Sequence, residues 1–271
     1  MKKLGILDSG VGGLTVLKSL IETKKISKVI YFADTKYFPY GTKPVDFIQK
    51  RVDEIINFFL EEGVEEVIIA CNTASSTAYD YLRNKFSLPI HSIVNSALSG
   101  LSRFNGKILG VLATRRTLES GLYPQLIKRI NPEIKVFVES CSEGILLETI
   151  EKGIIEGEII EEELHKCMIP LMEKNIEGLI LGCTHLPFIA PVIKRNYSNI
   201  TVIDPSEEIV NIVEKDEENV EEIKIDIFVT KNELEFKEIL KKLLKVEWNV
   251  NKIDWERSEV GAFKGEINKK I

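Results

Sequence analysis

Short apolar runs alternate with longer amphipathic segments along most of the chain. The runs predict strands at residues 3–8, 28–34, 66–71, 88–94, 107–114, 134–140, 178–183, 200–205 and 223–230. The amphipathic segments predict helices that start near Gly13 and cover residues 45–62, 75–85 and 231–245. Such alternation indicates parallel sheets with helices on both faces, so the sequence predicts an α/β fold.

Two stretches of the chain repeat at similar distances. "LGILDSGVGGLTVL" aligns with "LGVLATRRTLESGL", which matches Ser9 with Thr114. "EEVIIACNTA" aligns with "EGLILGCTHL", which matches Cys71 with Cys183. Two similar offsets in the same order predict two pseudo-symmetric domains, each a mainly parallel sheet flanked by helices. Facing domains would place both cysteines on opposite walls of one cleft, so we expect the active site in the interdomain cleft.

The division between these domains can be placed along the chain. We expect residues 1–94 and 207–271 to form the first domain and residues 95–206 to form the second. The strand at 223–230 and the helix at 231–245 would return to complete the first domain, before a polar tail. Ligands of parallel α/β sheets bind beyond the carboxyl ends of the strands. The residues directly after each apolar run are therefore the candidates for chemistry.

Composition narrows the class of protein. The 271 residues are 44% hydrophobic and 29% charged, an ordinary balance with ample core material. A net charge of −6 without clustered positive charge argues against binding of nucleic acid or of anionic membranes. The first apolar stretch is short and contains Asp8, and no run approaches transmembrane length, so we expect a cytoplasmic protein. Its four cysteines are then expected to be free, and their spacing predicts no metal site.

Cys71 and Cys183 each end a predicted strand just before a helix entrance. Partly positive backbone N–H groups there would lower the pKa of each thiol below its usual value of about 8.5. Their polar neighbours and their duplication favour a chemical role. Cys141 and Cys167 are instead expected to pack as small hydrophobic residues. His185 lies two residues after Cys183 and could deprotonate it or bind a carboxylate, whereas the other two histidines have no such neighbours.

Two loops are ambiguous from their residues alone. Asp8 precedes "SGVGGLT", whose glycines allow close backbone approach and whose hydroxyls could bind an anionic group at a helix N-terminus. The same stretch could be a tight turn in which Asp8 is a helix cap. The turn at 39–41, "PYG", could present N–H groups to a ligand or serve only as a turn.

Two thiols facing across a cleft suit three chemistries. They could form a redox pair, act as a nucleophile with a spare thiol, or act as two acid/base groups on opposite faces of one carbon. A redox pair usually lies close in sequence, and a cysteine hydrolase leaves the second thiol unexplained. Two-base proton transfer uses both, because one thiolate removes a proton from a stereocentre while the opposite thiol donates one.

Four motifs resemble those of one known family. "LDSGVGGLTV", "PYG", "ACNTAS" and "LGCTHLP" occur in the order and spacing of glutamate racemases, in the cofactor-independent aspartate/glutamate racemase superfamily. The resemblance implies interconversion of L- and D-glutamate without cofactor or metal, to supply D-glutamate for peptidoglycan. It implies glutamate as the small-molecule partner, and family members form homodimers in several arrangements.

The resemblance also implies roles for individual residues. Cys71 would take the α-proton from D-glutamate and Cys183 from L-glutamate. Asp8 and His185 would assist them. The residues implied to bind substrate are Asp8, Ser9, Pro39, Tyr40, Gly41, Cys71, Asn72, Thr73, Thr114, Thr117, Thr184 and His185.

Two segments depart from the family pattern. Residues 113–117 read "ATRRT" in place of "GTxxT", although both threonines are kept. The segment after Cys141 lacks a proline-rich pattern, so Glu151 is not counted among the expected site residues. Because of these departures, the alternative function is that of a related racemase or isomerase that acts on another small acid. A binding protein without activity is the alternative from another class, against which the intact cysteines argue.

Overall fold

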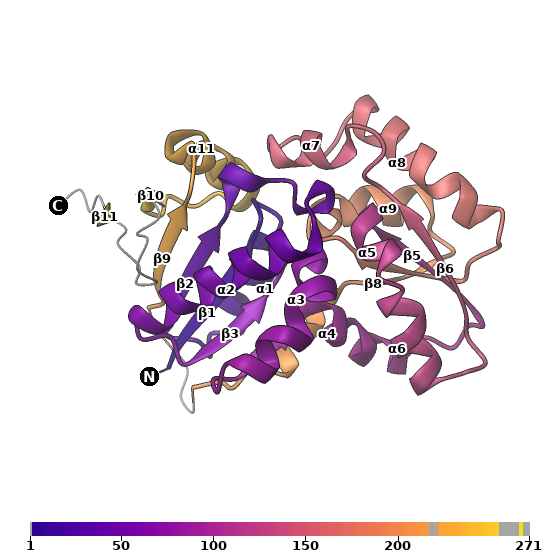
Figure 1. Ribbon diagram of the computed structural model, residues 1–271. Helices are drawn as coiled ribbons and strands as arrows, with labels where there is room; N and C mark the ends of the chain where they lie inside the picture. Colours follow the sequence, from indigo (N-terminus) through magenta and orange to yellow (C-terminus); the bar gives the residue numbers. More distant parts are fainter. Residues whose placement is uncertain (1, 217–219, 221, 255–265, 268–271) are drawn as a thin grey trace.

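The computed structural model describes residues 2–216, 220, 222–254 and 266–267 of the chain. The remaining residues of the predicted 207–271 segment lie outside this description. Two sheets lie side by side, each with helices on both faces (Figure 1). The predicted α/β architecture with two similar halves is therefore confirmed, whereas the exact domain boundaries stay a prediction.

The first sheet has the strand order β11-β10-β9-β2-β1-β3-β4. All its neighbours pair in parallel except β11, which is antiparallel to β10. Its strands are β1 (Lys3–Asp8), β2 (Lys28–Ala33), β3 (Glu66–Ile69), β4 (Ile90–Ser92), β9 (Lys224–Val229), β10 (Val250–Asp254) and β11 (Glu266–Ile267). β10 forms where the sequence predicts a polar tail, because Val250 and Ile253, on opposite faces of this strand, pack into the two apolar clusters that flank the first sheet.

The second sheet has the order β6-β5-β7-β8 and is parallel throughout. Its strands are β5 (Ile108–Ala113), β6 (Lys135–Ser140), β7 (Gly178–Gly182) and β8 (Thr201–Ile203). The order β2-β1-β3-β4 in the first sheet is the same pattern, so β1 corresponds to β5 and β3 to β7. The two repeated stretches of the sequence are thus equivalent strands.

The helices cover the sheets in a pattern set by alternating apolar side chains. Leu4 and Ile6 face an apolar cluster with α1, whereas Leu7 faces a second cluster with α2 and α3. A third cluster packs α7, α8 and α9 on one face of the second sheet. The bounds of these helices are α1 (Leu14–Glu22), α2 (Val45–Glu61), α3 (Asn72–Lys85), α7 (Leu146–Glu151), α8 (Glu158–Met172) and α9 (Ala190–Asn196).

The first cluster continues through α4 and α6 into the second half. The two halves therefore share one continuous apolar core behind the cleft. The remaining helices are α4 (Ile93–Gly100), α5 (Arg115–Glu119), α6 (Leu122–Ile130), α10 (Pro205–Glu208) and α11 (Glu233–Leu244). Short 3-10 turns cover Thr35–Tyr37, Tyr40–Thr42, Leu101–Arg103, Leu186–Ile189 and Ile209–Asn211.

Two predicted boundaries are wrong near the carboxyl ends of strands. The expected strand 88–94 ends at Ser92, because the Ser92 hydroxyl accepts a hydrogen bond from the Asn95 N–H (3.3 Å) and caps α4. The helix expected from residue 75 begins at Asn72, directly after Cys71. In both places the chain turns from strand into helix within one or two residues, which brings the helix N-terminus to the edge of the sheet.

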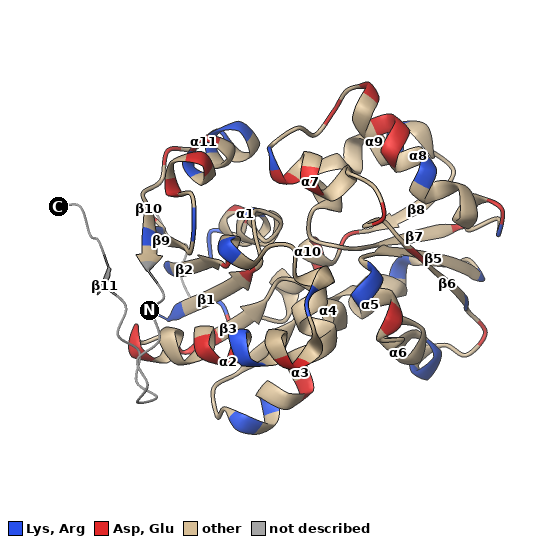
Figure 2. Ribbon diagram, turned by 45° about the horizontal axis from the view of Figure 1, so that its top comes forward, with Lys and Arg blue, Asp and Glu red and all other residues tan. Residues whose placement is uncertain are grey.

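Charged residues of both signs are distributed over both halves. Helices α3 and α8 each carry acidic and basic residues (Figure 2). Among the described helices, none combines the length and the apolar character needed to cross a membrane.

Candidate active site

A small cavity lies between the carboxyl ends of the two sheets. Its volume of about 20 Å³ holds about one water molecule. It is lined by Ser9, Phe38, Pro39, Tyr40, Gly41, Cys71, Asn72, Thr73, Thr114, Leu147, Cys183, Thr184 and His185. The structure thus brings nearly every expected site residue to one place. Asp8 and Thr117 are buried behind this lining, whereas Phe38 and Leu147 line the cavity although the sequence did not single them out.

Cys183 follows β7 and lies beside a cationic partner. The His185 Nδ1 atom is 3.7 Å from its sulfur. A hydrogen bond from the Cys141 thiol, together with the contact to His185, holds the pKa of Cys183 well below its usual value despite burial. Burial disfavours the charged imidazole, but its contacts with Cys183 and Glu151 outweigh this and raise the pKa of His185. The opposite directions of these two pKa shifts favour a thiolate–imidazolium pair of Cys183 and His185.

Glu151, the last residue of α7, contacts the His185 imidazole at the nitrogen that points away from Cys183. Its carboxylate lies 2.6 Å from the His185 Nε2 atom and accepts the Val11 N–H with both oxygens, at 3.2 and 3.1 Å. A Cβ at Gly10 would lie only 2.4 Å from a Glu151 oxygen, so a side chain there would displace this carboxylate. The glycine-rich loop therefore does bind an anionic group, as one of the two interpretations suggested. That group is a side chain of the second half.

Cys71 follows β3 and precedes the first residue of α3. Its sulfur is 3.8 Å from the Ser9 hydroxyl, and its side chain is almost fully buried. Burial, aided by the negative charge of Asp8, raises the pKa of the Cys71 thiol to about 12. The predicted lowering is therefore wrong for this cysteine, because burial and a nearby anion outweigh the N–H groups of the helix.

Asp8 connects the two halves beneath the cavity. One carboxylate oxygen accepts the Gly10 N–H (2.9 Å), and the other accepts the Thr184 hydroxyl (3.1 Å). Complete burial raises the pKa of Asp8 to about 7, although the His185 charge opposes this. A Cβ at Gly12 would lie 2.3 Å from the Thr184 hydroxyl oxygen, so the loop after β1 packs directly on the loop after β7.

A buried ionic network positions the "PYG" turn. Tyr40 donates from its hydroxyl to Asp34 (2.6 Å), and Arg51 donates to both oxygens of that carboxylate (3.0 and 2.9 Å). The Thr230 hydroxyl donates to the same carboxylate (3.0 Å). These bonds offset the cost of burying both charges. They fix Tyr40 and the neighbouring Gly41 at the cavity wall.

Polar groups from both halves meet on the opposite wall. The Thr73 and Thr114 hydroxyls are 2.8 Å apart, and Thr117 lies 3.1 Å behind Thr114. The Tyr123 hydroxyl donates to the Asn72 side-chain oxygen (2.7 Å), whereas the buried Asn72 amide nitrogen has no protein partner. An unused buried donor at the edge of this cavity is suited to a carboxylate ligand. The threonines of "ATRRT" therefore keep their place despite the altered neighbours.

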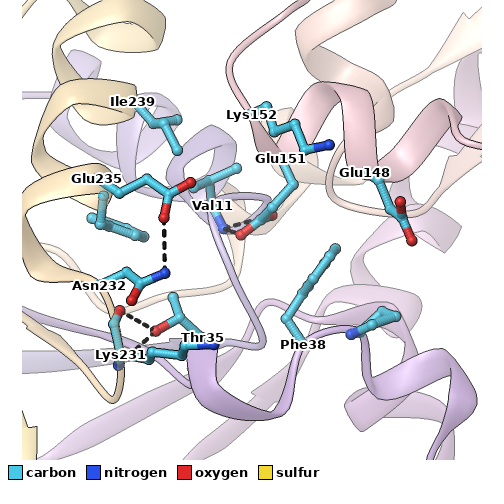
Figure 3. A pocket seen from close by; sticks show the side chains of 12 residues that line it. Val11, Thr35, Phe38, Glu148, Glu151, Lys152, Lys231, Asn232, Glu235 and Ile239 are labelled. Carbon is cyan, nitrogen blue, oxygen red and sulfur yellow. Dashed lines mark hydrogen bonds between the residues drawn. The ribbon is translucent and has the colours of Figure 1, made fainter.

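A second, larger cavity of about 300 Å³ lies outside the first (Figure 3). It separates α7 from α11 and shares Phe38 and Pro39 with the inner cavity. The Phe38 ring packs on the His185 imidazole, with ring centroids 5.5 Å apart. Glu151 forms part of the wall of the outer cavity, and the Glu151 carboxylate accepts a hydrogen bond from the Val11 N–H (Figure 3). Phe38 and Glu151 thus separate the outer cavity from the thiolate–imidazolium pair.

The other cysteines and histidines lie away from the cavity lining. Cys71, Cys141, Cys167 and Cys183 are all free thiols. His91 pairs with Glu66 (2.6 Å), and His165 is exposed. Within the described part of the chain, no cluster of three or more histidine, cysteine, aspartate and glutamate side chains is arranged to hold a metal ion.

The fold and cavity define an α/β enzyme that carries one thiol on each of two equivalent strands. Residues 16–213 match the family model described as Asp/Glu/Hydantoin racemase. The chain is 41% identical over 215 residues to glutamate racemase 1 of Caldanaerobacter subterraneus, covering 78% of this chain and 79% of that protein. The chain therefore belongs to the Asp/Glu/Hydantoin racemase family, and it is an isomerase.

Solved structures agree with this assignment. A glutamate racemase isoform from Bacillus anthracis matches with a TM-score of 0.86 and 26% identity, covering 93% of this chain and 97% of that one. Glutamate racemase from Francisella tularensis, solved in complex with D-glutamate, matches with a TM-score of 0.81 and 31% identity, covering 92% and 95%. The two-domain arrangement of the present chain is thus that of glutamate racemase structures.

Proposed function

We propose that this protein interconverts L- and D-glutamate by a two-thiol proton transfer at Cα. The observation that carries the proposal is the pair of thiols that follow equivalent strands of the two sheets and line one small cavity. The relatives of this chain named glutamate racemase supply the substrate. Cys71 and Cys183 are the proposed acid and base, assisted by Asp8 and His185 respectively.

The ionisation of the two thiols sets the direction of the first proton transfer. Cys183 is the thiolate and Cys71 the thiol, because their pKa values are shifted in opposite directions. Cys183 would remove the α-proton of L-glutamate, and Cys71 would donate its proton to the opposite face of the carbanion. This gives D-glutamate, a Cys183 thiol and a Cys71 thiolate, from which the reverse reaction starts.

The remaining polar groups of the cavity would bind the substrate carboxylates and ammonium. The free Asn72 amide and the hydroxyl of Ser9 offer donors at the wall, whereas the Thr184 hydroxyl donates to Asp8. The residues proposed to bind substrate are Asp8, Ser9, Pro39, Tyr40, Gly41, Cys71, Asn72, Thr73, Thr114, Thr117, Thr184 and His185. Since glutamate needs several times the room of one water molecule, binding requires the two halves to separate first.

The wider role follows from this chemistry. No cofactor takes part in the proposed mechanism, since the thiols perform both proton transfers. D-glutamate made in the cytoplasm would supply peptidoglycan synthesis. We propose residues 1–94 with 207–271, and residues 95–206, as the two units that move apart, with a homodimer as a possible assembly.

Circular dichroism of glutamate solutions tests the proposal directly. Purified protein is incubated with L-glutamate and, separately, with D-glutamate, without added cofactor. We expect the optical signal to decay to zero from both sides. A signal that persists from either enantiomer would contradict the proposal. A parallel panel of other small acidic amino acids distinguishes glutamate from the alternative, a related racemase or isomerase with another acidic substrate.

A further inference from the structure

Each of the two cavity thiols is followed by a polar side chain that bonds to the opposite half of the molecule. Thr184 follows the thiol after β7, and its hydroxyl donates to Asp8 at the end of β1 (3.1 Å). Asn72 follows the thiol after β3, and its side-chain oxygen accepts the Tyr123 hydroxyl from α6 (2.7 Å). The first bond uses the single proton of the Thr184 hydroxyl. The second uses the oxygen of the Asn72 amide and leaves its buried nitrogen without a protein partner.

The Tyr123 hydroxyl determines which end of the Asn72 amide faces the cavity. Tyr123 is buried, and burial raises its pKa, so the hydroxyl keeps its proton. Among the described residues, the Asn72 oxygen is the one acceptor within hydrogen-bond distance of this hydroxyl. A half turn of the amide would leave the phenolic O–H buried without an acceptor, which is unfavourable. Asn72 lines the cavity and Tyr123 lies behind that lining, so the amide nitrogen is turned to the cavity side.

Packing holds both partners of this hydrogen bond in place. The Tyr123 ring belongs to the apolar cluster that continues behind the cleft, together with Ile127 of the same helix. Asn72 is the first residue of α3, and the next residue, Thr73, contacts the Thr114 hydroxyl of the second half (2.8 Å). Two consecutive residues of α3 are thus bonded to the second half. The freedom that remains to Asn72 is the rotation of its terminal amide, and the Tyr123 hydroxyl restricts this rotation.

We propose that Tyr123 is a positioning residue for substrate binding. Its hydroxyl holds the Asn72 oxygen, so that the amide presents its N–H donors to a carboxylate of the substrate. Tyr123 does not line the cavity, so it acts through Asn72. Without the hydroxyl, the amide can turn its oxygen toward the cavity, where an acceptor would face the substrate carboxylate. This inference rests on the function proposed above, in which glutamate occupies the cavity.

The first test removes the Tyr123 hydroxyl and keeps the buried ring. In Tyr123→Phe we expect KM to rise about fivefold for both enantiomers of glutamate at near-constant kcat, because the ground state and the transition state lose the same contact. Tyr197→Phe is the matched control, since the Tyr197 hydroxyl contacts His165 (3.3 Å) outside the cavity lining, and it should change neither constant. An unchanged KM in Tyr123→Phe would overturn the inference, as would a loss confined to kcat.

A double-mutant cycle separates positioning from packing. Asn72→Ala removes the amide, so the Tyr123 hydroxyl has nothing left to orient. If Tyr123 acts through Asn72, then Tyr123→Phe raises KM no further when it is added to Asn72→Ala. Effects of the two substitutions that multiply in the double variant would overturn the inference, because independent effects indicate that Tyr123 contributes to the site by packing alone.

The orientation of the amide is also measured without substrate. The side-chain amide protons of Asn72 are assigned in isotope-labelled protein by their loss in Asn72→Ala, and their nuclear Overhauser contacts with the aromatic ring at position 123 are recorded. We expect weak contacts in the wild type, where the amide oxygen faces the ring, and stronger ones in Tyr123→Phe. Strong contacts in the wild type would overturn the inference. Absence of racemisation in a wild type with weak contacts would instead count against the proposed function alone.

Discussion

Cys71 and Cys183 occupy equivalent places in the two sheets, yet their surroundings favour opposite ionisation states. Cys183 has a cationic imidazole at 3.7 Å and a donor in Cys141. Cys71 has the Ser9 hydroxyl at 3.8 Å and the anionic Asp8 nearby. The position after a parallel strand therefore does not set the pKa of a thiol. Groups contributed by neighbouring loops, including those of the other half, decide it.

This difference prepares the free enzyme for one direction of reaction. A Cys183 thiolate with a Cys71 thiol can accept L-glutamate at once, whereas D-glutamate requires the reverse arrangement of protons. The two enantiomers have equal free energy in water, so kcat/KM must be equal in both directions. The asymmetry between the thiols can therefore appear only in kcat and KM separately.

The largest predicted effect comes from the removal of one thiol at a time. Replacement of either Cys71 or Cys183 by Ser removes one of the two proton carriers, and we expect racemisation to fall by about 10³- to 10⁴-fold. Elimination from a chlorinated glutamate analogue needs only one base, which removes the α-proton as chloride leaves. Each variant should therefore keep elimination with one enantiomer of the analogue.

The enantiomer that survives identifies the remaining base. Cys71→Ser, which retains Cys183, should eliminate from the L-analogue, and Cys183→Ser from the D-analogue. Release of chloride, followed by ion chromatography, measures this elimination. Racemisation at the wild-type rate in either variant would exclude that cysteine from the mechanism.

Local sequence features were sufficient to predict most of the fold and the cavity lining. Buried parallel strands read as apolar runs, and polar residues directly after them necessarily meet at one edge of the sheet. For this reason Cys71, Thr73, Thr114 and Cys183 could be placed from sequence. The match of β1 with β5 and of β3 with β7 depends on the same local signal.

Features that depend on distant contacts could not be predicted in this way. Glu151 meets Val11 across 140 positions of the chain, and only the folded arrangement shows that its carboxylate completes the glycine-rich loop. Phe38 reaches the site by packing on His185 from the other half. The raised pKa of Cys71 likewise depends on burial and on Asp8.

A second prediction concerns Asp8, whose negative charge helps to raise the pKa of Cys71. In the folded protein the pKa of Asp8 is about 7, compared with an ordinary value of 3.8. Between these values the folded state keeps a proton that the unfolded state releases, so the contribution of Asp8 to stability falls as pH rises through this range. The shift corresponds to a loss of at most ~4 kcal/mol.

Asp8→Asn cannot titrate and should not show this loss. Urea unfolding at several values of pH, for the wild type and the variant, measures it. We expect the free energy of unfolding of the wild type, relative to the variant, to decline from about pH 4 to pH 7 and to be constant above. A difference that stays constant over the whole range would show that Asp8 is ionised throughout. The same variant should lower the pKa of Cys71 and so reduce the contrast between the thiols.

The smallest predicted effect tests how Glu151 keeps the His185 imidazole protonated beside Cys183. Glu151→Gln keeps the shape of the side chain but removes the charge that raises the pKa of His185. The imidazolium should then lose its proton at lower pH, so the alkaline limb of the racemase pH profile moves to lower pH, and kcat falls about tenfold at the optimum. Glu148→Gln, one turn earlier on α7 and exposed at the outer cavity, is the matched control and should change neither. Equal effects of the two variants would mean that the outer cavity, and not the contact with His185, connects α7 to the thiolate.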